Sequence, residues 1–139
     1  MGAWLVGCTC NDAGCNDTLV LRFVGAGSDG RLAPGQYEIE AGDVTCSIAI
    51  GMGYPEEGPF YPCNVEEGET FELRVDEASV TMLLWVPPRA EVVSVVVRRD
   101  DAVIADHIYP LLPTLATWHY PNGRSCGGEC AHWSLELAL

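Results

Sequence analysis

Residues 91–109 read EVVSVVVRR, then DD, then AVIADHIY, so two apolar runs flank Asp100 and Asp101. Alternate residues of the first run, Val93, Val95 and Val97, are all apolar. Alternation with period two and a high content of β-branched residues predict two pleated strands, and the aspartate pair predicts a two-residue turn between them. Because a hairpin alone is marginal in water, this one requires a larger sheet and a partner for its apolar face.

Similar alternation recurs along the chain and predicts about eight strands and no long helix. Besides the hairpin, we expect strands over 18–24, near 37–41, and over 44–50, 70–75, 79–86 and 132–139, with residues 111–122 as a connecting loop. The inward side chains of the fourth of these strands are predicted to be Phe71, Leu73 and Val75. Many short strands with turn residues between them are typical of an antiparallel β-sandwich. We therefore predict one all-β sandwich domain over 18–139, preceded by a tether and cysteine-rich loop over 1–17.

The segment Leu32-Ala-Pro-Gly-Gln-Tyr-Glu-Ile39 resembles the phrase that opens a strand in prealbumin-like surface modules. Pro34 and Gly35 suit the turn, and the alternating residues that follow suit the strand. The resemblance implies an immunoglobulin-like or prealbumin-like sandwich.

The net charge is −13, from 20 acidic and 7 basic residues. Such a field repels the phosphates of nucleic acids and anionic lipid headgroups, so neither is an expected partner. No apolar run is long enough to span a membrane. We expect a monomer without a cofactor.

Seven cysteines in 139 residues are typical of a secreted domain held together by disulfides. Cys46 and Cys63 flank a loop rich in Gly and Pro, so we predict that they pair. Among the fifteen possible connectivities, we favour one in which Cys10 and Cys15 bond to Cys126 and Cys130. Leu5-Val-Gly-Cys8 resembles a bacterial lipobox, which implies a lipid on Cys8. Only seven residues precede this cysteine, so the lipobox reading requires a start upstream of Met1.

Together with the closing Pro-Asn-Gly-x-x-Cys-x3-Cys phrase, this layout is similar to small predicted bacterial lipoproteins of unassigned activity. The similarity implies secretion or attachment to the outer surface of a bacterial envelope. It assigns no catalytic residue.

Two stretches rich in aromatic residues are candidate ligand surfaces, because rigid rings provide contact area at low entropic cost. Their candidate binding residues are Tyr54, Phe60, Tyr61, Trp118, His119 and Tyr120. The expected function is a non-catalytic binding or structural module for a protein or carbohydrate. Two alternatives remain: a small metal-assisted hydrolase using His119, His132 and nearby carboxylates, and a disulfide-stabilised inhibitor or effector.

Other motifs lack the sequence context that their chemistry requires. Gly25 to Gly30 matches G-x-G-x-x-G, but no helix is predicted after it, so we interpret it as a turn. Cys126-x3-Cys130-x-His132 could contribute to a zinc site, although oxidised thiols would exclude it. The acidic turns, such as that around Asn16 and Asp17, do not match a calcium loop. We therefore predict no bound metal.

Overall fold

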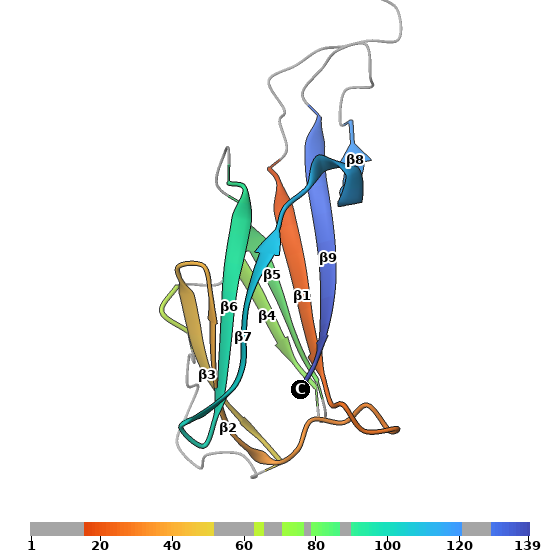
Figure 1. Ribbon diagram of the computed structural model, residues 1–139. Coiled ribbons are helices and arrows are strands. Elements are labelled where there is room, and N and C mark those ends of the chain that lie inside the picture. The colour runs from red at the N-terminus through yellow and green to blue at the C-terminus, as the bar shows by residue number, and fades with distance from the viewer. Residues whose placement is uncertain (1–15, 52–62, 66–70, 77–78, 87–89, 121–128) are drawn as a thin grey trace, which may run out of the picture.

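A computed structural model describes residues 16–51, 63–65, 71–76, 79–86, 90–120 and 129–139. The described residues form nine strands in two sheets that face each other, which confirms the all-β sandwich (Figure 1). One sheet has five strands in the order β4 (Phe71–Val75), β5 (Val80–Trp85), β1 (Thr18–Val24), β9 (Cys130–Ala138) and β8 (Thr117–His119). The other has four, in the order β3 (Val44–Ile50), β2 (Gly35–Ala41), β6 (Val92–Arg99) and β7 (Ala102–Pro110).

Strand pairing is antiparallel except between β1 and β9, the first and last strands described. These two run parallel, with Thr18 opposite His132 and Val24 opposite Ala138. The pairing places residues 114 positions apart side by side in the centre of the five-stranded sheet. The first and last described strands are therefore neighbours within this sheet.

The β6–β7 hairpin has the predicted two-residue turn, with Arg99 opposite Ala102. Asp100 and Asp101 both have positive φ, 51° and 69°, as a type I′ turn requires. The Asp100 carboxylate also accepts a hydrogen bond from the backbone N–H of Gln36, at 2.9 Å. This bond ties the turn to β2, the neighbouring strand.

The core lies between the sheets and contains the side chains that were predicted to face inward on most strands. From the hairpin it takes Val93, Val95 and Val97, and from β1 it takes Leu19, Leu21 and Phe23. The predicted inward position of Val75 is wrong, because that side chain is 46% exposed. Val75 is the last residue of an edge strand, paired with Val80 across the β4–β5 connection, and so lies at the margin of the core.

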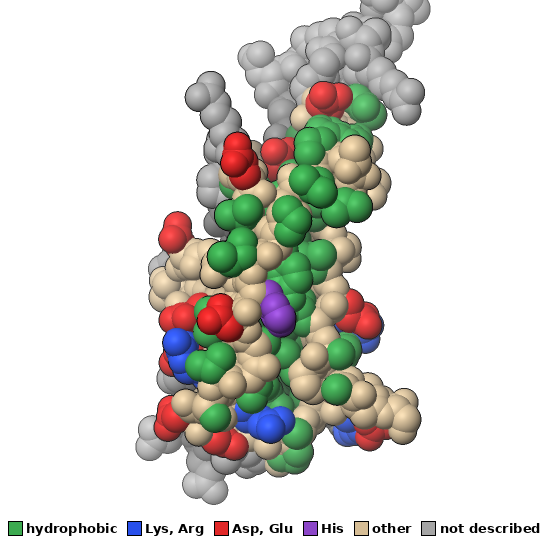
Figure 2. Space-filling view, viewed as in Figure 1, with side chains coloured by type: hydrophobic (Ala, Val, Ile, Leu, Met, Phe, Trp, Pro, Cys, Tyr) green, Lys and Arg blue, Asp and Glu red, His purple; other side chains and the backbone are tan. Residues whose placement is uncertain are grey.

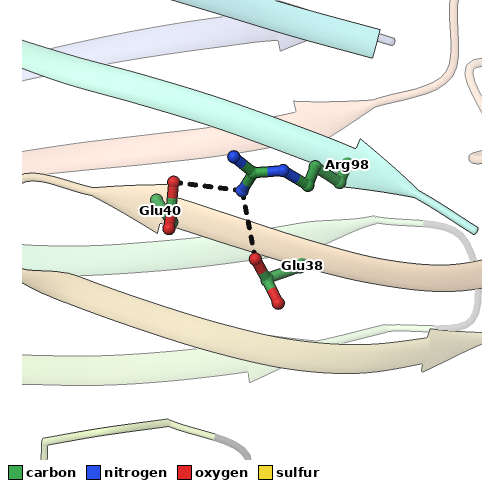
Figure 3. A network of polar contacts seen from close by, with 3 residues as sticks. All are labelled: Glu38, Glu40 and Arg98. Atoms are coloured by element: carbon green, nitrogen blue, oxygen red, sulfur yellow. Dashed lines mark hydrogen bonds and ion pairs between the residues drawn. The ribbon is translucent and has the colours of Figure 1, made fainter. Parts of the chain in front are cut away.

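The outer face of the four-stranded sheet carries a small ionic network (Figure 3). Nη1 of Arg98 on β6 donates to carboxylate oxygens of Glu38 and Glu40 on β2, at 3.1 Å each. The hydrogen bond to Glu40 and the charge of its carboxylate raise the pKa of Arg98 above its ordinary value. Because these side chains remain partly exposed, the ion pairs contribute little to stability.

The predicted Cys46–Cys63 disulfide is confirmed. Cys46 is fully buried on β3, and Cys63 lies opposite it in an isolated antiparallel bridge. Cys130 is also disulfide-bonded, so its thiol is not available as a metal ligand. The other cysteines, Cys8, Cys10, Cys15 and Cys126, lie outside the described residues.

The prediction of a connecting loop over residues 111–122 is wrong in part. Pro113–Leu115 form one turn of 3₁₀ helix, and Thr117–His119 form β8, which pairs with the start of β9. A strand of three residues is too short to produce a period in the sequence. In the parts of the chain that the structure describes, no helix has the length and apolar character needed to cross a membrane.

Candidate functional site

Two tryptophans hold the short turn between β7 and β8. The indole Nε1–H of Trp118 donates to the carbonyl of Pro113 at 3.2 Å, and that of Trp133 donates to the carbonyl of Leu112 at 2.9 Å. The backbone N–H of Leu115 donates to Leu112 as well, at 3.0 Å. The turn is therefore fixed by hydrogen bonds from its neighbours on β8 and β9.

This fixed turn presents apolar side chains to solvent. Leu112 is 47% exposed and Leu115 is 65% exposed, while Trp118 is 39% exposed. Val92 and Ile108 are both more than half exposed. They point away from the core at the end of the hairpin that leads into this turn. We call this set the β7–β8 apolar surface; it consists of Val92, Ile108, Leu112, Leu115 and Trp118, which gather where β7 leads into β8 and lie on more than one face of the sandwich.

A shallow groove adjoins the β7–β8 apolar surface and is lined by Ala90, Glu91, Val92, Leu111, Leu112 and Pro113. Figure 2 shows hydrophobic side chains gathered in a band that runs along this side of the molecule toward the end where β8 lies. Exposed apolar groups that cluster beside a groove are a common feature of interaction sites, whereas scattered ones are not. The surface is therefore the strongest candidate for ligand contact among the described residues.

Two of the three histidines meet on the opposite side of β8. The imidazole rings of His119 on β8 and His132 on β9 have centroids 6.1 Å apart. Nδ1 of His132 is hydrogen-bonded to the hydroxyl Oγ1 of Thr18 on β1. The remaining histidine, His107, lies on β7 beside Tyr109, at a ring separation of 5.7 Å. The sequence grouped His119 and His132 only as an alternative, and the fold brings them together.

The predicted binding residues are divided by the structure. Trp118 lies opposite the buried Ala131, so it has the inward parity, while His119 lies opposite Cys130 on the outer face of the sheet. Tyr120 follows β8 and is half-buried. Tyr54, Phe60 and Tyr61 lie outside the described residues.

Sequence reasoning missed Leu112 and Leu115. Both lie in a stretch predicted as a loop, but Leu111 in the same stretch is buried, so the sequence did not distinguish the exposed leucines from a core residue. Tyr109, which precedes these leucines in the sequence, is partly buried on β7, and this burial raises the pKa of its phenol.

Two other sequence motifs have structural roles. Residues 25–30 form a turn, closed by hydrogen bonds from the Gly25 N–H to the Gly30 carbonyl and from the Gly30 N–H to the Gly27 carbonyl. Asp17 accepts a hydrogen bond from the backbone N–H of Ala131 at 2.8 Å, which ties the start of β1 to β9. Where the structure describes the chain, no group of three or more His, Cys, Asp or Glu residues is arranged to hold a metal ion.

Comparison of the chain with protein-family models, with curated proteins and with solved structures finds no significant match. The functional argument therefore rests on the geometry of the described residues.

Proposed function

We propose that this protein is a non-catalytic binding module whose ligand contacts the β7–β8 apolar surface. The observation that carries the proposal is the turn at Leu112–Leu115, held by two indole N–H groups and presenting two exposed leucines. A backbone segment that is already ordered before binding avoids part of the entropic cost of ordering it, and Trp118 adds an aromatic side chain of the kind that often dominates interfaces.

A protein or peptide ligand fits this surface better than a carbohydrate. Carbohydrates stack on aromatic faces, whereas four of the five members of the β7–β8 apolar surface are aliphatic. The acidic composition adds a second criterion. A chain with a net charge of −13 attracts a partner with basic residues around its apolar anchors.

We place this binding outside the cytoplasm, in a secreted or lipid-anchored bacterial envelope protein. The support comes from cysteine chemistry: the Cys46–Cys63 bond and the disulfide of Cys130 are stable in oxidising compartments. Attachment through a lipid on Cys8 remains part of the proposal. It is tested by the intact mass of protein recovered from its native envelope.

The binding proposal is tested with a phage-displayed peptide library and a glycan array, both probed with the oxidised protein. We expect selected peptides that combine apolar and basic residues, and we expect L115S and W118A each to weaken their binding about tenfold or more. The matched controls are V75S and V103S, since Val75 and Val103 are similarly exposed but lie outside the surface and its groove. Controls that weaken binding as much as the test variants would refute the assignment, and binding only to glycans would exclude a peptide ligand.

A further inference from the structure

The outer face of the five-stranded sheet brings three polar side chains into one row across β1, β9 and β8. Thr18 lies opposite His132 on β1 and β9, and His132 lies opposite Thr117 on β8. His119 is two residues further along β8 on the same face, so it is the diagonal neighbour of His132. From this arrangement we infer that His119 and His132 form a binding site for a borderline divalent transition-metal ion, such as Cu²⁺, Ni²⁺ or Zn²⁺.

The separation of the two rings suits a shared ion. A metal–nitrogen bond of about 2 Å places an ion roughly 3 Å from the centre of each imidazole ring. Two ring centres that share one ion are then about 5 Å apart for tetrahedral geometry and somewhat more than 6 Å apart for ligands on opposite sides. The observed separation of 6.1 Å lies within this range. Since His119 is exposed, rotation of its side chain can bring the rings closer.

Thr18 prepares His132 for this role. When the imidazole carries its proton on Nδ1, that N–H donates to Oγ1 of Thr18, and Nε2 keeps its lone pair for a metal. Such outer-shell hydrogen bonds fix the tautomer and the orientation of ligating histidines. Thr18 is therefore a positioning residue, while His119 and His132 are the ligands.

The donor set determines which ions bind. Neutral imidazole nitrogen prefers copper, nickel and zinc over magnesium and calcium, which prefer oxygen ligands. Among the described residues no third His, Cys, Asp or Glu joins the pair. For a pair of imidazole ligands the expected order of affinity is Cu²⁺, then Ni²⁺ and Zn²⁺.

The experiment is calorimetric titration of Cu²⁺, Ni²⁺ and Zn²⁺ into the full-length, oxidised, untagged protein. We expect one saturable site, and we expect H119A and H132A each to weaken binding by about tenfold or more, because each leaves a single ligand. The matched control is H107A, which removes the histidine that lies apart from the pair. T18V keeps both ligands but removes the orienting hydroxyl, so it should weaken binding less than loss of a ligand.

The inference is overturned if the wild-type protein shows no saturable binding, or if H107A weakens binding as much as H119A. A second measurement avoids substitution altogether. Substoichiometric Cu²⁺ should broaden the imidazole C–H resonances of His119 and His132 in NMR spectra and leave those of His107 sharp. Equal broadening of all three histidines would indicate only nonspecific contact with the metal and would contradict the site.

Discussion

Removal of the Cys46–Cys63 disulfide should destabilise the protein by an amount that can be worked out from the fold. The bond joins positions 17 apart in sequence, and closing a loop of that length removes unfolded-state entropy worth about 3 kcal/mol at 25 °C. Cys46 is also fully buried, so alanine in its place adds a packing loss of about 1 kcal/mol. The double variant C46A/C63A should therefore lose about 3–4 kcal/mol.

The assay is equilibrium unfolding in urea followed by circular dichroism, together with a thermal melt. For a domain of this size, about 3–4 kcal/mol corresponds to a fall in Tm of roughly 10 °C. Using the double variant leaves neither cysteine of the pair as a free thiol. Mass spectrometry after alkylation shows whether the other cysteines keep the oxidation state that they have in the wild type.

A second variant separates the covalent link from native contacts at the same place. Asn64 follows Cys63 and clamps β3 with its side chain: its Oδ1 accepts from the Thr45 N–H at 2.8 Å, and its Nδ2 donates to the Asp43 carbonyl at 2.9 Å. N64A removes both bonds and should cost about 1–2 kcal/mol while the disulfide stays intact. A loss below about 1 kcal/mol in C46A/C63A, with a normal loss in N64A, would refute the loop-entropy argument.

Two further predictions concern the hairpin. Asp101 has a φ of 69°, which glycine adopts without steric cost, so D101G should raise the free energy of unfolding by about 0.5–1 kcal/mol. D100G should not raise it, because this variant loses the hydrogen bond to the Gln36 N–H. Urea unfolding of both variants checks the difference, and equal effects would contradict the assigned role of Asp100. Burial raises the pKa of the Tyr109 phenol, so the unfolded chain loses that proton at a lower pH than the folded chain. The free energy of unfolding should therefore fall as the pH rises through the ordinary tyrosine range toward the raised value. Unfolding of Y109F across alkaline pH should show a shallower fall, and an unchanged slope would exclude Tyr109 as the source of the pH dependence.

The strands that the sequence predicted well are those whose apolar parity is unbroken. Residues 18–24 and 44–50 match the observed β1 and β3 in both bounds, and the hairpin turn lies at the predicted aspartates. Alternation of apolar and polar residues with period two can be read from a short stretch of sequence. Burial of one face of the sheet then fixes which of the alternate side chains point into the core. The prediction failed at Val75, where parity was correct but the core had ended.

The features that the sequence could not provide depend on pairing between distant strands. β8 has only three residues, and it is a strand because residues 130–132 lie beside it. The contact between Thr18 and His132 joins residues 114 apart, and it exists because β1 and β9 run parallel. Neither pairing changes the local periodicity of the sequence. The sequence therefore named His119 and His132 together as an alternative but could not predict that they lie side by side.

The same alternation that predicts strands also separates the two proposed sites at β8. Trp118 and His119 are adjacent in sequence, and a single aromatic loop would present both to one ligand. On a strand, consecutive side chains point to opposite faces, so Trp118 joins the β7–β8 apolar surface while His119 joins His132 on the outer face. Ligand recognition and metal binding are therefore separable: W118A should leave copper binding unchanged, and H119A should leave peptide binding unchanged. If each variant impaired both activities, β8 would act as one site, and the division between its two faces would be wrong.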